Sequence, residues 1–158
     1  DGIYNECVRL AKSGFTEIVL AGIHICSYGK DLENVTLLDL LKKIHDIEGL
    51  ERIRLSSIEP NAFTDEFIEG LKKLPKVCHH FHISLQSGCD ETLKRMNRRY
   101  DSSFYKSICE KIMTAFPDSA ITTDLITGFP GETDEEFEET RVKAKAFLDL
   151  FNTGFPDT

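Results

Sequence analysis

The chain has 158 residues, of which 41% are hydrophobic, and a formal net charge of -8. This length suits about one domain with a buried core, and the acidic balance excludes the broad basic surface that binds nucleic-acid phosphates. No apolar run approaches the roughly 20 residues that span a bilayer, and the start lacks the pattern of a signal peptide, so we expect a cytoplasmic protein. The first residue is Asp1, and we expect the chain to be a piece of a larger protein.

The cysteines are widely separated along the chain, at Cys7, Cys26, Cys78, Cys89 and Cys109. Zinc and iron-sulfur sites use closely spaced pairs or triplets of cysteines. We therefore expect reduced thiols with mostly structural roles, and no metal site in this chain.

Apolar residues alternate between helical and strand spacing from the start of the chain. Residues 3–13 predict a helix and residues 17–22 predict a strand. Thr36 and Asp39 have the spacing of a capping box at the start of a helix over 37–47. The elements expected after it are a strand over 51–56, a helix over 64–74, a strand over 80–85, helices over 90–96 and 101–115, a strand over 120–126 and a final helix to about 150.

Two further helix starts carry their own signals. Thr64 is a cap for the third helix, and Thr133 with Glu136 forms a capping box for the last one. Strands that alternate with helices in this way predict right-handed βαβ units and a parallel sheet. No sequence repeat or low-complexity linker divides the chain, which we expect to be one domain or part of one.

Three of the expected strands carry a polar face, which is unusual for a parallel sheet covered by helices on both sides. Period-two alternation places these side chains opposite the apolar ones: Arg52, Arg54, Ser56, His80, His82, Ser84, Gln86, Thr122 and Asp124. Satisfied core hydrogen bonds explain any single residue, because an unpaired buried polar group costs about 1 to 3 kcal/mol. For three strands together, we expect a partial or splayed barrel whose open interior holds a polar ligand.

The segments that follow the strands read LAGIHICSYG, LSSIEPN, LQSGCDE and LITGFPGE. In βα barrels and open parallel sheets, chemistry takes place beyond the carboxyl ends of the strands. GFPGE lacks the P-loop pattern, so taken alone it indicates a tight turn between strand and helix.

Together these segments resemble the radical S-adenosylmethionine (SAM) methylthiotransferases that modify tRNA, especially the threonylcarbamoyladenosine group. The likeness covers about residues 3–139 and is densest in EIVLAGIHICSYGKDL, RIRLSSIEP, HISLQSG, LKRMNRRY and ITTDLITGFPGETDEEF. The resemblance implies an α/β fold: a partial, open βα barrel of the radical SAM type with about four parallel strands and outer helices. The strands here would be the second to fifth of the six in that barrel.

The resemblance also implies a set of contacts to SAM. Gly22 matches the position where the backbone approaches the amino acid end of SAM, and Ser84 and Gln86 match polar contacts to its ribose and methionine. Ile126 matches an apolar contact to adenine. Arg95 is a candidate for the SAM carboxylate, since a guanidinium can bind a carboxylate bidentately, although an exposed helical arginine is an equal alternative.

Two further positions are candidates for substrate selection. Glu59, in SSIEP, lies where related groups differ from one another, and His24 lies at the mouth of the barrel; each has a surface residue as its alternative. Arg98, Arg99 and Tyr100 form a small basic and aromatic patch that either touches RNA or belongs to a solvated turn. No residue is assigned a catalytic role.

Radical SAM chemistry uses a [4Fe-4S] cluster on a C-x-x-x-C-x-x-C loop, and this chain has no such triplet. We therefore expect residues 1–158 to be a fragment of the radical SAM domain, without its cluster-binding start, the amino-terminal cluster domain and the carboxyl-terminal RNA-binding domain. SAM, the clusters and tRNA would bind in the full-length parent, with tRNA held mainly by the missing domains. The tail after Glu139 does not continue into the expected sixth strand. Alone, the fragment is expected to be inactive and to self-associate through unpaired strand edges.

These expectations lead to one main hypothesis and three alternatives. The main hypothesis is a parent enzyme that adds a methylthio group to a modified adenosine of tRNA. A radical SAM methylthiotransferase acting on a ribosomal protein and a non-catalytic nucleotide-binding barrel module are the first two alternatives. The third, a barrel aldolase or isomerase, lacks a convincing catalytic lysine on a strand and rests on fold analogy alone.

Overall fold

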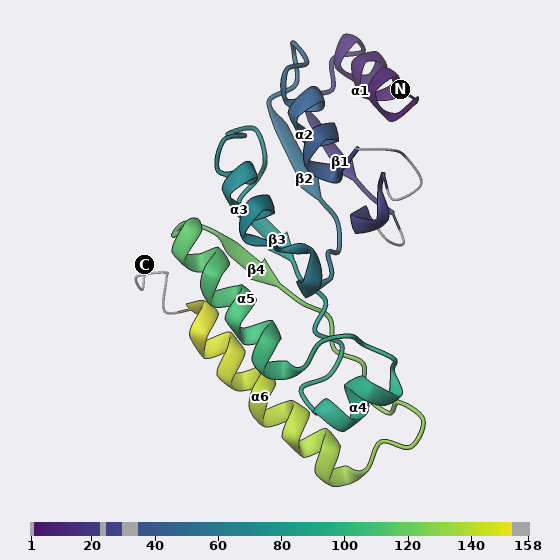
Figure 1. Ribbon diagram of the computed structural model, residues 1–158, viewed down its shortest axis with the longest axis vertical. Coiled ribbons are helices and arrows are strands. Elements are labelled where there is room, and N and C mark those ends of the chain that lie inside the picture. Colours follow the sequence, from purple (N-terminus) through teal and green to yellow (C-terminus); the bar gives the residue numbers. More distant parts are fainter. Residues whose placement is uncertain (1, 23–24, 30–34, 153–158) are drawn as a thin grey trace.

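The computed structural model describes residues 2–22, 25–29 and 35–152 (Figure 1). Helices and strands alternate along these residues, and each element expected from the sequence is present. The order is α1 (Gly2–Lys12), β1 (Glu17–Leu20), α2 (Leu37–His45), β2 (Arg52–Leu55), α3 (Asp65–Leu71), β3 (His80–His82), α4 (Asp90–Arg95), α5 (Ser102–Ala115), β4 (Ala120–Thr122) and α6 (Asp134–Asn152). Two short 3-10 turns that the sequence did not predict, η1 (Ile25–Ser27) and η2 (Pro60–Ala62), follow β1 and β2.

The strands are parallel, as expected. β1 pairs with β2, with Glu17 opposite Arg52, and β3 pairs with β4, with His80 opposite Ala120. The two pairs are joined by single parallel bridges, one of which places Ile58 opposite Ile83. The prediction of an α/β fold with four parallel strands is therefore confirmed, while the described residues form two small sheets and no closed barrel.

The regular strands are shorter than the sequence predicted, most clearly at β3 and β4. The amide N–H of Leu85 donates to the Thr123 hydroxyl, at 2.9 Å, in place of a carbonyl on the neighbouring strand. Backbone pairing resumes beyond this point, where the Gln86 N–H donates to the Asp124 carbonyl and the Ile126 N–H donates to the Gln86 carbonyl. A side chain thus interrupts the ladder between the end of β3 and Gln86.

The helix starts follow the capping signals of the sequence. The Thr36 hydroxyl accepts from the Asp39 N–H, and the Asp39 carboxylate accepts from the Thr36 N–H. Thr133 and Glu136 make the same reciprocal pair at α6. Thr64 caps α3 through the N–H of Phe67, at 3.1 Å, which confirms the third signal.

The core lies between the helices and one face of the strands. The apolar strand residues are buried under the helices: Ile18, Leu20, Ile53, Leu55, Phe81 and Ile83. Helices α5 and α6 lie side by side (Figure 1), with the rings of Tyr105 and Phe147 5.3 Å apart. The polar faces of the strands lie on the opposite side, so in the described residues the helices cover one side of the strands.

No disulfide joins the cysteines of the described residues, and Cys7, Cys89 and Cys109 are buried. Burial raises the pKa of the Cys109 thiol to about 12, so this side chain is an inert part of the core. None of the helices in the described ranges is long and apolar enough to cross a membrane.

Candidate functional site

The carboxyl ends of the four parallel strands meet along one edge, and the candidate residues lie along it. Gly22 follows β1, Glu59 follows β2, Gln86 follows β3 and Ile126 follows β4. Gln86 and Ile126 are neighbours, because the Ile126 N–H donates to the Gln86 carbonyl at 2.8 Å. His24 lies outside the described residues, so its candidate role stays a prediction.

Gln86 has an unusual backbone for a residue with a side chain. Its φ is 72°, in the left-handed region where non-glycine residues are uncommon and which is over-represented at ligand sites. Its carboxamide makes no hydrogen bond within the described part of the chain. Beside it, the Ile126 side chain is 42% exposed. The pair therefore presents a polar amide next to an open apolar surface, an arrangement that suits a nucleoside.

Ser84 lies in a different environment from the one that strand periodicity predicted. This residue is only 7% exposed, and the regular strand ends before it, at His82. The Tyr100 hydroxyl donates to the carbonyls of Ser84, at 2.8 Å, and Leu85, at 3.3 Å. A contact between the Ser84 hydroxyl and a cofactor stays a prediction.

The position of Tyr100 bears on both alternatives for the basic and aromatic patch at residues 98–100. Tyr100 is buried, and burial raises its pKa to about 12, so the neutral hydroxyl serves as a donor inside the protein. Its ring is therefore not available to stack on a base. Arg98 and Arg99 lie beside it in the sequence, but Arg98 is paired with Glu59 at 3.2 Å. Neither of the two alternatives, RNA contact or a solvated turn, holds for Tyr100, whose hydroxyl instead donates to the carbonyls of Ser84 and Leu85 after β3.

Arg95 is already engaged by a carboxylate of the protein. Its two terminal nitrogens bind the two oxygens of Glu136 at the start of α6, and one of them also donates to the Thr92 hydroxyl. The guanidinium holds the pKa of the Glu136 carboxyl below its usual value. Binding of a SAM carboxylate to Arg95 would require this ion pair to open, and that role stays a prediction.

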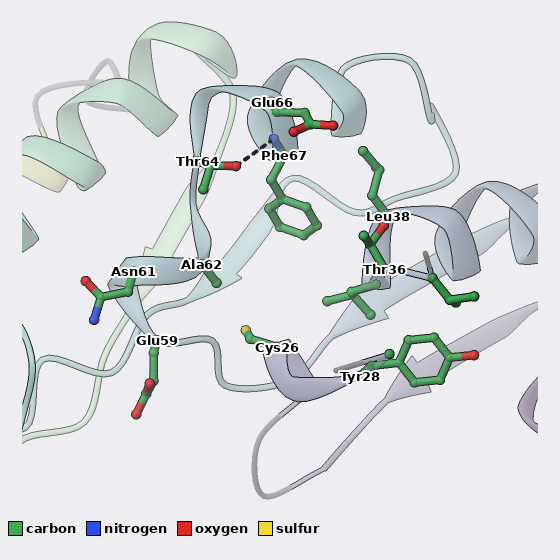
Figure 2. A pocket seen from close by; sticks show the side chains of 13 residues that line it. Cys26, Tyr28, Thr36, Leu38, Glu59, Asn61, Ala62, Thr64, Glu66 and Phe67 are labelled. Atoms are coloured by element: carbon green, nitrogen blue, oxygen red, sulfur yellow. Dashed lines mark hydrogen bonds between the residues drawn. The ribbon is translucent and has the colours of Figure 1, made fainter. Parts of the chain in front are cut away.

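A cavity of about 410 Å³ lies at the same edge, beside Glu59, and the sequence reasoning missed it. Figure 2 shows Glu59 and Asn61 at one end of the cavity, Tyr28 at the other, and Phe67 above it. Its walls come from η1, η2 and the first turns of α2 and α3. No periodicity argument singles out its two aromatic lining residues, Tyr28 and Phe67.

The polar side chains of the strands do converge on one face, as expected. On β1 and β2, Glu17 accepts from Arg52 at 2.5 Å and from Arg54 at 3.1 Å, and both arginines lower the pKa of the Glu17 carboxyl. These contacts satisfy the charges on this part of the face. They confirm that the polar residues of neighbouring strands point the same way.

The same face continues across β3 and β4. The Thr122 hydroxyl lies 3.0 Å from His82 Nδ1 and 3.2 Å from His80 Nε2, and His82 Nε2 lies 3.3 Å from Asp124 Oδ2. Burial lowers the pKa of His80, and the positive charge of Arg54 adds to this effect. His80 Nδ1 is buried and has no hydrogen-bond partner among the described residues.

The described residues contain no group of three or more His, Cys, Asp or Glu side chains arranged to hold a metal ion. No residue described here is therefore assigned to a metal or cluster. The features that the edge does offer are the Gln86 amide, the exposed Ile126 side chain and the exposed backbone at Gly22. These suit an organic cofactor with a nucleoside part.

Comparison with known proteins gives a consistent family. Curated proteins named tRNA-2-methylthio-N(6)-dimethylallyladenosine synthase are 48% identical over 141 residues in Thermoanaerobacter sp. and 47% identical over 141 residues in Clostridium botulinum. The protein of that name from Clostridium tetani is 45% identical over 139 residues. Each match covers 87% to 89% of this chain and 30% to 31% of the relative, so the chain spans under a third of their length. The sequence model of the radical SAM superfamily matches residues 3–144, and the chain therefore belongs to the radical SAM superfamily.

Proposed function

We propose that the protein containing this chain is a transferase that adds a methylthio group to a modified adenosine of tRNA by radical SAM chemistry. The observation that carries the proposal is the 48% identity, over 141 residues, to a synthase named for 2-methylthio-N(6)-dimethylallyladenosine in tRNA. The alternative of a ribosomal protein substrate has no support among the names of these relatives. The acidic charge of the chain fits a protein that holds tRNA, in the cytoplasm, mainly through parts outside residues 1–158.

We further propose that residues 1–158 are part of a partial βα barrel. Two observations support it: the strands follow one another in parallel order, and their polar side chains share the face that the helices leave open. In a closed eight-stranded barrel, bulky branched residues fill this interior. Charged and polar side chains here fit an open barrel with a solvated interior.

Within that barrel, the carboxyl edge of the strands is the proposed SAM site. SAM, together with a [4Fe-4S] cluster held elsewhere in the protein, supplies the radical chemistry and the methyl group. In this proposal, the Gln86 carboxamide hydrogen-bonds the polar part of SAM, and Ile126 covers the adenine ring. Among the described residues, a Cβ added at Gly22 would meet the Ile25 backbone, at 3.9 Å, which is an ordinary contact and supports a role for this backbone beside the amino acid end of SAM.

Two similarities point to different modified adenosines as the substrate. The relatives are named for a dimethylallyl group, which is apolar, whereas the sequence motifs resemble the threonylcarbamoyl group of enzymes, whose substrate carries a carboxylate. Glu59 lines the cavity at the carboxyl edge and is paired with Arg98. These two residues are our candidates for distinguishing an apolar N6 group from one that carries a carboxylate. A free Arg98 would favour the carboxylate, and its pairing with Glu59 opposes it.

The test is mass spectrometry of tRNA nucleosides from a strain that lacks the gene, with the intact gene returned as the control. We expect loss of one 2-methylthio adenosine and accumulation of its unmodified precursor, and the precursor identifies the N6 group. Unchanged 2-methylthio nucleosides would rule out the tRNA function.

A further inference from the structure

One face of α6 holds the segment that connects β3 to α5. The residues of this face recur at helical spacing, and each contacts either that segment or α5, which follows it: Glu136, Thr140, Lys143 and Phe147. Glu136 binds Arg95 of α4, Lys143 donates to the Ser102 hydroxyl at 2.9 Å, and Phe147 packs on Tyr105. α6 therefore fixes the position of the chain that follows Gln86.

Thr140 is the contact of this face that lies nearest to Gln86. Its hydroxyl oxygen accepts from the N–H groups of Gly88 and Cys89, both at 3.2 Å, and lies 2.9 Å from the Ser87 hydroxyl. Either hydroxyl can be the donor in the bond between Thr140 and Ser87, and the Ser87 hydroxyl oxygen also accepts from the Cys89 N–H at 3.1 Å. One hydroxyl thus fixes three successive residues.

These groups lie out of contact with water. Thr140 is 2% exposed, and Ser87 is fully buried. Hydrogen bonds between such groups are costly to break, because a buried donor left without an acceptor has no water to replace it. The hydrogen bonds between Thr140 and residues 87–89, called the Thr140 lock below, therefore form a rigid part of the structure.

Gly88 makes the close approach possible. A Cβ added at Gly88 would lie 2.9 Å from the Thr140 Cα and 3.2 Å from its carbonyl oxygen, which are both backbone atoms of α6. No side-chain rotation relieves such a contact, so α6 and the loop would have to separate. The sequence LQSG therefore encodes a loop that fits directly against a helix.

We propose that Thr140 is a positioning residue that fixes Gln86 in its left-handed backbone conformation, with the carboxamide directed toward SAM. A non-glycine residue keeps such a conformation only where its surroundings impose it, and the residues directly after Gln86 are the ones that Thr140 holds. The inference rests on the proposed function, since it takes Gln86 as a SAM contact. Neither the family match nor the motifs of the strand ends point to Thr140, which lies in the middle of α6.

The experiment compares Thr140→Val with Thr140→Ser in the full protein that contains this chain. Valine keeps the shape of threonine and removes the hydroxyl, whereas serine keeps the hydroxyl. Binding of S-adenosylhomocysteine is measured by calorimetry on the protein without its cluster, so the readout does not depend on activity. We expect the Kd of Thr140→Val to rise about tenfold, as for loss of one well-placed polar contact, and that of Thr140→Ser to stay near the wild-type value.

A control separates positioning from simple loss of stability. Ile44→Val removes a buried methylene group from α2, away from the Thr140 lock, and destabilises the protein without an effect on this loop. Its Kd should match the wild type, while hydrogen exchange at the Gly88 and Cys89 amides should accelerate only in Thr140→Val. A Thr140→Val protein that binds like the wild type overturns the inference and leaves the proposed function standing. Absence of binding to the wild type overturns the proposed SAM site itself.

Discussion

Replacement of Tyr100 by phenylalanine tests how the end of β3 is held in place. The Tyr100 hydroxyl donates to the Ser84 carbonyl at 2.8 Å and to the Leu85 carbonyl at 3.3 Å, and the side chain is only 8% exposed. Phenylalanine keeps the ring packing and removes the donor. The variant therefore isolates one shared hydrogen bond at the point where the regular strand has ended.

The expected loss of stability follows from the burial of the two carbonyls. A net hydrogen bond contributes about 1 kcal/mol, and a buried acceptor left unpaired adds to the loss, so we expect about 1 to 2 kcal/mol. With a urea dependence of about 2 kcal/mol per molar, the unfolding midpoint should fall by roughly 0.5 to 1 M. Urea titrations followed by circular dichroism measure this shift.

Tyr4→Phe is the matched control. Tyr4 is exposed on α1 and, within the described ranges, its hydroxyl makes no hydrogen bond, so the same chemical change there should leave the midpoint unchanged. A Tyr100→Phe midpoint equal to that of the wild type would refute the reasoning, because it would mean that the hydroxyl does not hold the Ser84 segment. An equal decrease in both variants would refute it as well.

Three other predictions concern charge and assembly. The pKa of His80 is lowered in the folded protein, so the unfolded chain takes up a proton at a higher pH, and the stability of the fold decreases as the pH drops through about 6.5. In His80→Asn, the urea midpoint should therefore change less between about pH 8 and about pH 5 than in the wild type. Arg95 lowers the pKa of Glu136, so the ion pair contributes to stability above the ordinary carboxyl pKa, and this contribution is lost in acid. In Glu136→Gln, the urea midpoint should therefore decrease less than in the wild type as the pH falls below about 4.5. We expect residues 1–158 alone to self-associate, because β1 and β4 each pair on one side only among the described residues and Val19 of β1 is 54% exposed. A single monomeric species in sedimentation velocity, with a cooperative thermal transition, would contradict this expectation.

Local signals in the sequence predicted the elements well. Capping residues such as Thr36 and Thr64 act through bonds to the next few residues, so their effect is readable without the fold. The polar face was also readable, because side-chain direction in a strand alternates regardless of what lies around it. His82 and Asp124 accordingly meet across neighbouring strands.

The strand ends could not be read in the same way. Strand periodicity predicts an open position for Ser84, but this residue is only 7% exposed and the Tyr100 hydroxyl donates to its carbonyl, while the Thr123 hydroxyl interrupts the ladder at Leu85. The roles of Tyr100 and Thr140 depend on contacts between residues 15 or more positions apart, 53 in the case of Thr140 and Ser87. Such contacts are properties of the assembled fold, and no local pattern encodes them.

The most direct test of the account is the location of SAM on the protein. Radiolabelled SAM is crosslinked to the full protein with ultraviolet light, and the labelled peptides are identified by mass spectrometry. The account predicts labels in the peptides that contain Gln86 and Ile126, at the carboxyl ends of β3 and β4. Labels confined to the opposite end of these strands, near His79 and Asp118, would contradict it.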